Sequence, residues 1–506
     1  MGVMTFLLPD GVGTGLRREL ERCCLAGGPD NMPTPTELTF TAGQLRTRRL
    51  SDESGYLVSP WEVDGVGLVM GTTATLMERT RPYSLLVELA RGKVNQMRCQ
   101  SADWRMGGLQ IGPELQQAIS DATRAFGRAV TGASWAKPGP AETRQAQEAL
   151  DLGYQAAGQL VAAYVEQVFQ IRQQRAPKLD TALGCRLVPE NGAVPGVLAG
   201  GAVPLAEAFN CVSLPLSWYD VEAEESSYNW KAWDELLAWA DARQLPVTAG
   251  PLVDFSSLML PAWLWLWERD VPSMASFMCK FVEAAVRRYK GSIRRWQVSA
   301  GSNCARVLGL DEEELLGLTY RLADTARQVD PSLELIIGIA QPWGEYMATS
   351  EWNHSPFIFA DTLIRSGINN LAGLDLEIVM GVQPRGSYCR DVLEASRLLD
   401  LYALLGVPLR VTLGYPAAAG PDAAADPELR VEGGRWRDGF TPQTQAEWAE
   451  AFGSLALCKP FVQSVQWAQL SDAQPHQFPH AGLVDASGQP RPALERLRQL
   501  RERHLR

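Results

Sequence analysis

The sequence predicts a multidomain protein in which a (β/α)8 TIM barrel follows a β-sandwich-like N-terminal domain and a long linking helix. Three observations support this prediction. The chain has 506 residues, too many for one ordinary hydrophobic core. Its last two thirds alternate short apolar strands with helical patterns. Between these parts, one uninterrupted helical stripe is bracketed by prolines.

Residues 1–135 form the first predicted domain. Their apolar residues come in short alternating runs rich in Val, Thr and Leu, and Gly and Asp separate the runs. Successive short strands of this kind are typical of a β-sandwich. The clearest runs are Glu37 to Phe40, Gly55 to Val58, Gly67 to Met70 and Tyr83 to Leu89, and a helical piece, Pro113 to Val130, ends the region.

Residues 136–178 are predicted to form a bridging helix. From Ala141 to Arg175 the apolar residues recur at spacings of four and three, which places them on one face of a helix. We expect this face to pack on a neighbouring element of the same chain. A dimerising coiled coil is the alternative, which Gly153 and Gly158 disfavour.

Residues 179–506 are predicted to form the barrel, because eight strand candidates alternate with helices. The strands are Thr181 to Leu187, Cys211 to Trp218, Pro246 to Asp254, Arg295 to Ala300, Leu333 to Ala340, Leu374 to Val382, Pro408 to Gly414 and Ser464 to Leu470. In such barrels, ligands bind at the carboxyl ends of the strands. The Ala-, Gly- and Asp-rich segment Ala417 to Phe440 follows the seventh strand, and we expect it to be mobile and able to cover the mouth.

Composition excludes several classes of function. Lys and Arg total 47 against 58 Asp and Glu, so the formal charge of −11 disfavours nucleic acid as a partner. We find no apolar run long enough to span a membrane and no basic leader before the apolar start. The nine cysteines are odd in number and scattered, which favours reduced thiols and a cytoplasmic location.

Short motifs in the last region occur in a recognisable order. They are Tyr228-Asn229-Trp230, Pro261-Ala262-Trp263, the run Arg288 to Val298, Ala326-Arg327 with Asp330-Pro331, Gly381-Val382-Gln383, Trp467, and Gly482-Leu483-Val484-Asp485 with Pro490 and Pro492-Ala493. Together they resemble family 10 glycoside hydrolases, the xylanase barrels. The resemblance implies an oligo- or polysaccharide ligand and leaves the first 178 residues unexplained.

The same resemblance implies two catalytic glutamates that this chain lacks. The family's fourth strand ends in Trp-Asp-Val-Val-Asn-Glu, with Glu as acid/base, but here the run Trp296 to Gly301 ends in glycine. The seventh strand should end in Thr-Glu, with Glu as nucleophile, but here Thr412 precedes Leu413. A retaining glycosidase needs two carboxyl groups about 5–5.5 Å apart. Both catalytic positions, Gly301 and Leu413, are therefore interpreted as substituted.

Other carboxylates at predicted strand ends could have taken over catalysis. The candidates are Glu345, Asp254, Asp472 and Asp220. Glu345 is favoured because Gln341 to Tyr346 places an indole, a tight turn, an acid and a phenol together at the predicted ligand-binding face. For each of them, the alternative is a surface or helix-capping carboxylate.

The barrel region also supplies the predicted substrate contacts. Tryptophan stacks on the apolar face of a sugar ring, and the family resemblance implies a polar residue at Gln383 and aligns Arg385 with a family histidine. The substrate-binding candidates are Trp343, Gln383, Arg385, Trp263 and Tyr346. No cofactor and no metal are expected. His476 and His480 form an H-x-x-x-H in a Pro-bounded loop, and a metal site with Asp472 is the alternative, which the lack of a predicted helix there disfavours.

Three functions remain open at this stage. The favoured one is a catalytically degenerate, saccharide-binding protein. The first alternative is an active glycoside hydrolase in which Glu345 works with Asp254, Asp220 or Asp472. The second is a structural protein whose barrel and long helix serve assembly.

Overall fold

The barrel predicted for the C-terminal two thirds is present. The computed structural model describes the chain except residues 1, 11, 29, 42, 133–137, 191–192, 200–203, 257–258, 369–370 and 474. In the described residues, eight parallel strands pair in chain order and close through β20 with β9. They are β9 (Ala182–Arg186), β10 (Cys211–Leu214), β11 (Val247–Ala249), β13 (Arg295–Ala300), β14 (Glu334–Ile339), β15 (Leu371–Val379), β17 (Leu409–Gly414) and β20 (Val462–Trp467). A two-residue strand, β12 (Val253–Asp254), continues beyond β11 along β13.

Helices surround this barrel, and their starts follow from local sequence. The longer ones are α8 (Lys231–Asp241), α9 (Val271–Arg288), α10 (Glu312–Val329), α11 (Pro356–Arg365), α12 (Val392–Ala403), α13 (Pro442–Cys458) and α14 (Pro492–His504). Asp311, Ser355 and Thr441 cap α10, α11 and α13 by accepting backbone N–H groups, as N-cap residues do. Short helices lie in the connections: α5 (Gly196–Ala199), α6 (Leu205–Ala208), α7 (Trp218–Val221), η3 (Ala262–Trp267) and η4 (Glu345–Ala348).

Two sheets lie in the first region together with helices, and their strand pairs are antiparallel except for β1 with β8. One has the order β4-β5-β1-β8, and the other has the order β19-β7-β6-β2-β3, in which β19 (Arg435–Trp436) comes from the C-terminal part of the chain. Their strands are β1 (Gly2–Leu7), β2 (Cys24–Gly27), β3 (Met32–Thr34), β4 (Glu37–Thr41), β5 (Gln44–Arg49), β6 (Tyr56–Val63), β7 (Gly67–Thr72) and β8 (Tyr83–Ser84), with α1 (Thr14–Glu19) and η1 (Leu20–Arg22) between β1 and β2.

The predicted strand Tyr83 to Leu89 is wrong for most of its length. Only Tyr83 and Ser84 are in a strand, and α2 (Leu85–Met106) follows at once. The buried residues Leu86, Ala90, Val94 and Met97 recur at spacings of three and four, so the helical period extends well beyond the short apolar run.

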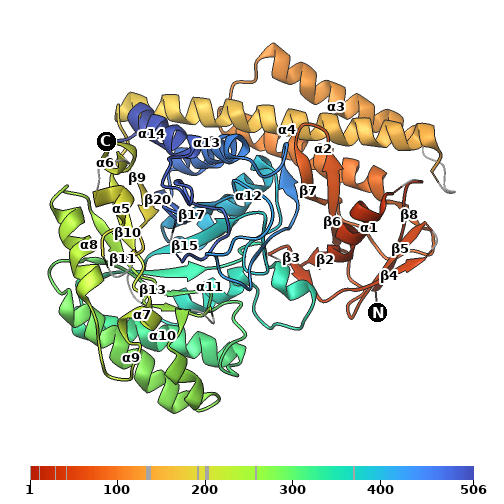
Figure 1. Cartoon of the computed structure of the whole chain (residues 1–506). Helices are drawn as coiled ribbons and strands as arrows, with labels where there is room; N and C mark the ends of the chain where they lie inside the picture. The colour runs from red at the N-terminus through yellow and green to blue at the C-terminus, as the bar shows by residue number, and fades with distance from the viewer. Residues whose placement is uncertain are drawn as a thin grey trace.

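The predicted bridging helix is confirmed as α4 (Pro140–Arg175), preceded by α3 (Pro113–Gly132). It packs on α2 and α3 in the N-terminal region and on α12 and α13 of the barrel, and Figure 1 shows it running across both parts. One continuous hydrophobic core joins the two parts. The predicted boundary between 135 and 136 lies outside the described residues, and the domain limits 1–135, 136–178 and 179–506 stay a prediction.

The segment after β17 connects the barrel to the N-terminal sheets. Its strand β18 (Arg430–Val431) pairs with β16 (Val382–Gln383), and β19 (Arg435–Trp436) extends the N-terminal sheet beside β7. The segment expected to be mobile is therefore anchored at both of these strands. No helix in the described part of the chain is long and apolar enough to cross a bilayer. All nine cysteines are free thiols, and six of them are buried.

Candidate functional site

The barrel interior is ionic rather than aliphatic. Arg186 on β9 lies 3.3 Å from both Asp375 and Glu377 of β15, and the Thr412 hydroxyl on β17 lies 2.9 Å from the Asp375 carboxylate. All four side chains are buried. Bulky branched residues fill most barrels of this type. Buried charges must be paired, and these strands bring the partners together from distant parts of the sequence.

Above this layer, Arg385 joins two carboxylates at the mouth. Its guanidinium forms a bidentate pair with Asp254 at 2.8 and 2.9 Å, and its Nε lies 3.3 Å from Glu377. Burial alone would raise the pKa of Asp254, but Arg385 and the Ser256 N–H lower it below its usual range. Burial would lower the pKa of Arg385, yet the two carboxylates raise it. Asp254 is therefore an ionised, fully engaged carboxylate.

Gly301 and Leu413, the two positions predicted to replace catalytic glutamates, face different environments. Gly301 follows β13 with a φ of 71°, and a Cβ there would lie 3.9 Å from Arg385 Nη2. Leu413 is 1% exposed. Side chains alternate along a strand, and Thr412 faces the interior, so Leu413 faces the helices. The inward neighbour is Gly414, where a Cβ would touch Val379 and Ala468.

A cavity of about 780 Å³ lies at the carboxyl ends of the strands, between the barrel and the N-terminal sheet. Its barrel wall includes Gly301, Gln383 and Arg385, and its opposite wall includes Arg22 and Met70. Connecting loops add Trp265, Arg306, Trp352, Glu345, Tyr346 and Asp426. Its volume lies within the range of small-ligand sites.

Glu345, the favoured relocated acid, lines this cavity but is held by a cation. Arg390 Nη2 lies 2.6 Å from its carboxylate, and the Tyr388 backbone N–H donates to it at 2.9 Å. The same guanidinium covers the Trp343 ring, 4.9 Å from its centroid, and Trp343 is 8% exposed. Tyr346 accepts a hydrogen bond from the Asn303 amide at 3.4 Å, and burial raises the pKa of its phenol.

The remaining predicted residues are dispersed. Trp263 packs edge-on against Trp218 and donates from its indole to the Glu222 carbonyl at 2.9 Å. Asp220 is exposed on α7. Asp472 pairs with Arg491 at 2.6 Å. Four of the predicted site residues belong to the described cavity lining: Glu345, Gln383, Arg385 and Tyr346. Four others are not in that lining: Asp254, Asp472, Trp343 and Trp263.

Sequence reasoning missed Asp426 and the N-terminal wall. Asp426 lies in the segment after β17, lines the cavity and is 7% exposed. Burial raises its pKa, although the Glu428 N–H it accepts lowers it in part. The only sequence signal was the position of this segment beside a strand end. Trp265 is 38% exposed, and its indole is available to a ligand.

A comparison with known families matches part of the barrel region. The sequence model of Glycosyl hydrolase family 10 matches residues 207–337. No curated protein matches the chain. Xylanase 10B from Thermotoga petrophila RKU-1, solved in complex with xylobiose, shares 16% identity with a TM-score of 0.47, covering 65% of this chain and 96% of that one. Native xylanase 10B from Thermotoga maritima shares 16% identity with a TM-score of 0.47, covering 65% and 97%. Over residues 207–337, about a quarter of its length, the chain is similar to family 10 glycosyl hydrolases.

Proposed function

We propose that this chain binds a saccharide in the 780 Å³ cavity and lacks the hydrolytic pair of family 10. The observation that carries this proposal is the composition of the cavity. It lies at the carboxyl ends of the strands and offers the indoles of Trp265 and Trp352 beside polar groups such as Gln383. Aromatic faces with a few placed polar groups are what a sugar ring requires.

The state of the carboxylates supports binding without hydrolysis. A general acid needs a raised pKa, whereas the pKa of Asp254 is lowered and both its oxygens are bonded to Arg385. The Glu345 carboxylate is paired with the Arg390 guanidinium. No carboxyl group is present at Gly301, at Leu413 or at Gly414, the inward-facing neighbour of Leu413. A retaining mechanism needs both an acid and a nucleophile at about 5–5.5 Å.

The first ligands to test are xylo-oligosaccharides, because the family 10 model matches residues 207–337. Isothermal titration calorimetry with xylotriose to xylohexaose, and with cello-oligosaccharides of the same lengths, should detect binding by wild-type protein. No reducing ends should be released over hours. If the titrations with both oligosaccharide series release only the heat of dilution, the proposal is contradicted.

A matched pair of tryptophan variants locates the ligand. Trp265→Ala should weaken saccharide binding by roughly tenfold, because an aromatic face contributes about 0.5–1.5 kcal/mol beyond its buried area. Trp267→Ala is the control. Trp267 is in the same turn, is 36% exposed and packs on Phe277 outside the described cavity lining. Equal loss in both variants would place the ligand elsewhere.

An active glycosidase with relocated acids is the second candidate, and Asp426 favours it. Its raised pKa suits a proton donor, and it shares the cavity with Glu345. If purified protein releases reducing ends, Asp426→Asn should abolish that release. Asp220→Asn, an exposed carboxylate on α7, should leave it unchanged.

A further inference from the structure

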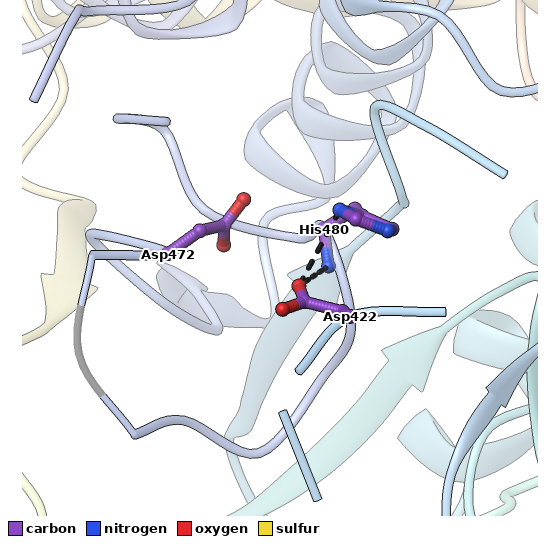
Figure 2. A group of neighbouring side chains, drawn as sticks. All are labelled: Asp422, Asp472 and His480. Carbon is purple, nitrogen blue, oxygen red and sulfur yellow. Dashed lines mark hydrogen bonds and ion pairs between the residues drawn. The ribbon is translucent and has the colours of Figure 1, made fainter. Parts of the chain in front are cut away.

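Two loops at the barrel mouth bring two carboxylates and two imidazoles together. Asp422 lies between β17 and α13, and the other three residues lie between β20 and α14. Asp422 Oδ2 lies 3.0 Å from His476 Nε2 and 3.4 Å from His480 Nδ1. Asp472 Oδ1 lies 4.0 Å from His476 Nε2. Figure 2 shows Asp422, Asp472 and His480 as neighbouring side chains. One possible ligand atom from each lies within 4.8 Å of the others.

The group is largely buried and carries an excess of negative charge when its histidines are neutral. The side chains of Asp472 and His476 are each 2% exposed, and that of Asp422 is 10% exposed. Arg491 lies 2.6 Å from Asp472 Oδ2 and compensates one carboxylate. The second carboxylate needs another positive charge, since an unpaired buried charge is costly.

From this arrangement we infer that Asp422, Asp472, His476 and His480 bind a divalent cation of the Zn²⁺ class. Imidazole and carboxylate together suit Zn²⁺ and its transition-metal neighbours, whereas Ca²⁺ takes oxygen ligands. Zn–N and Zn–O bonds of about 2.0–2.2 Å place tetrahedral ligands about 3.3–3.6 Å apart. The spacings of 3.0, 3.4 and 4.0 Å bracket that edge length.

Neighbouring groups orient the ligands, as they do in metal sites. The Gln469 amide donates to Asp472 Oδ1 at 2.6 Å, and the Gly482 N–H donates to the same oxygen at 2.8 Å. The His480 N–H donates to Asp422 Oδ2 at 2.9 Å. Because Arg491 holds Asp472 Oδ2, the Oδ1 atom is the one directed at His476, which favours monodentate ligation.

A cation here would fix part of the cavity wall. The Asp426 N–H donates to the His476 carbonyl at 3.0 Å, and Ala425 forms a β-bridge with His476. The two loops are therefore already paired next to the ligands. A bound ion would cross-link the segment that carries Asp426 to the segment that follows β20. This inference concerns the ion alone and does not depend on saccharide binding.

The test is titration of the EDTA-treated and dialysed full-length chain with ZnSO4, with MnCl2 and CaCl2 as comparisons. We expect one equivalent of Zn²⁺ per chain in calorimetry, weaker Mn²⁺ binding, no Ca²⁺ binding, and a rise in Tm that grows with Zn²⁺ concentration. Asp422→Asn and His480→Gln should each weaken Zn²⁺ binding by more than about 100-fold, because even second-shell changes cost about 10–100-fold.

The control is His354→Gln. His354 Nδ1 lies 2.9 Å from Glu312, an isolated His–carboxylate pair, so Zn²⁺ binding should be unchanged. A folded wild-type chain that takes up no Zn²⁺ at millimolar concentration would overturn the inference and leave a His476–Asp422 ion pair as the explanation. Loss of binding in the control as well would do the same, because the ion would then bind elsewhere.

Discussion

Arg385→Met should destabilise the protein strongly, because it leaves Asp254 buried without its partner. The two side chains are 11% and 10% exposed and share two hydrogen bonds of 2.8 and 2.9 Å. Breaking a buried ion pair costs about 3–5 kcal/mol. Unfolding entropy of about 2.1 cal/mol/K per residue gives roughly 1.1 kcal/mol/K for the whole chain, so we expect Tm to fall by about 3–5 °C if the chain unfolds as one unit.

The loss should also depend on pH in a defined direction. The pKa of Asp254 is lowered in the folded protein, so its contribution is present above its unfolded pKa and is lost as the pH falls through the folded value. Without Arg385, burial raises the pKa of Asp254, and the free-energy cost of burying its ionised carboxylate grows as the pH rises. The difference in unfolding free energy between wild type and variant should therefore widen from about pH 4 to pH 7.

The matched control is Arg435→Met. Arg435 Nη2 lies 2.8 Å from each oxygen of Glu62, so this pair also engages both carboxylate oxygens, but the side chains are 42% and 50% exposed. An exposed pair contributes about 0–1 kcal/mol. Urea unfolding at several pH values measures both variants. Equal losses in the two variants, or a difference independent of pH, would refute the reasoning.

Two further predictions concern the junction of the N-terminal region with the barrel and the packing of its helices. Lys93→Met should lower the free energy of unfolding in urea by about 3–5 kcal/mol, because Lys93 is 2% exposed and lies 2.8 Å from Asp391 of the barrel. Lys231→Met, at an exposed lysine, should lower it by less than about 1 kcal/mol. Similar losses in the two variants would contradict a buried junction. Gly92→Ala should lower Tm, because the added Cβ would lie 1.9 Å from the backbone oxygen of Thr72. Gly158→Ala in α4, where a Cβ meets nothing within 4 Å, should raise the free energy of unfolding by up to about 1 kcal/mol. An unchanged Tm in Gly92→Ala would show that α2 shifts freely.

The barrel was predictable because its signal is local. Arg295 to Ala300 was predicted as a strand and is β13 with the same bounds, since its six residues alone carry the strand pattern. Leu374 to Val382 corresponds to β15, shifted by three residues at each end. Strand ends are set by pairing partners in other segments, and the sequence of one segment does not contain them.

The candidate site was less predictable because its contacts join distant segments. Trp343 has the sequence context of a sugar platform, but Arg390, which is 47 positions later, covers its ring. Arg385 could be placed at the mouth, whereas its pairing with Asp254 depends on barrel closure. Asp426 lies in a segment that β18 and β19 anchor, and no local pattern revealed that anchoring.

The ionic interior bears on Gly301 and Leu413, the two positions predicted to be substituted. Three carboxylates and three guanidinium groups balance inside the barrel: Asp254, Asp375, Glu377, Arg186, Arg385 and Arg410. A glutamate at Gly301 would add a fourth carboxylate within reach of Arg385 and compete with Asp254 for it. A glutamate in place of Leu413 would face the apolar helix layer, where an unpaired charge is costly. Arg385 at the mouth is therefore satisfied by Asp254 and Glu377, and it needs neither a substrate nor a carboxylate at Gly301 as a further partner.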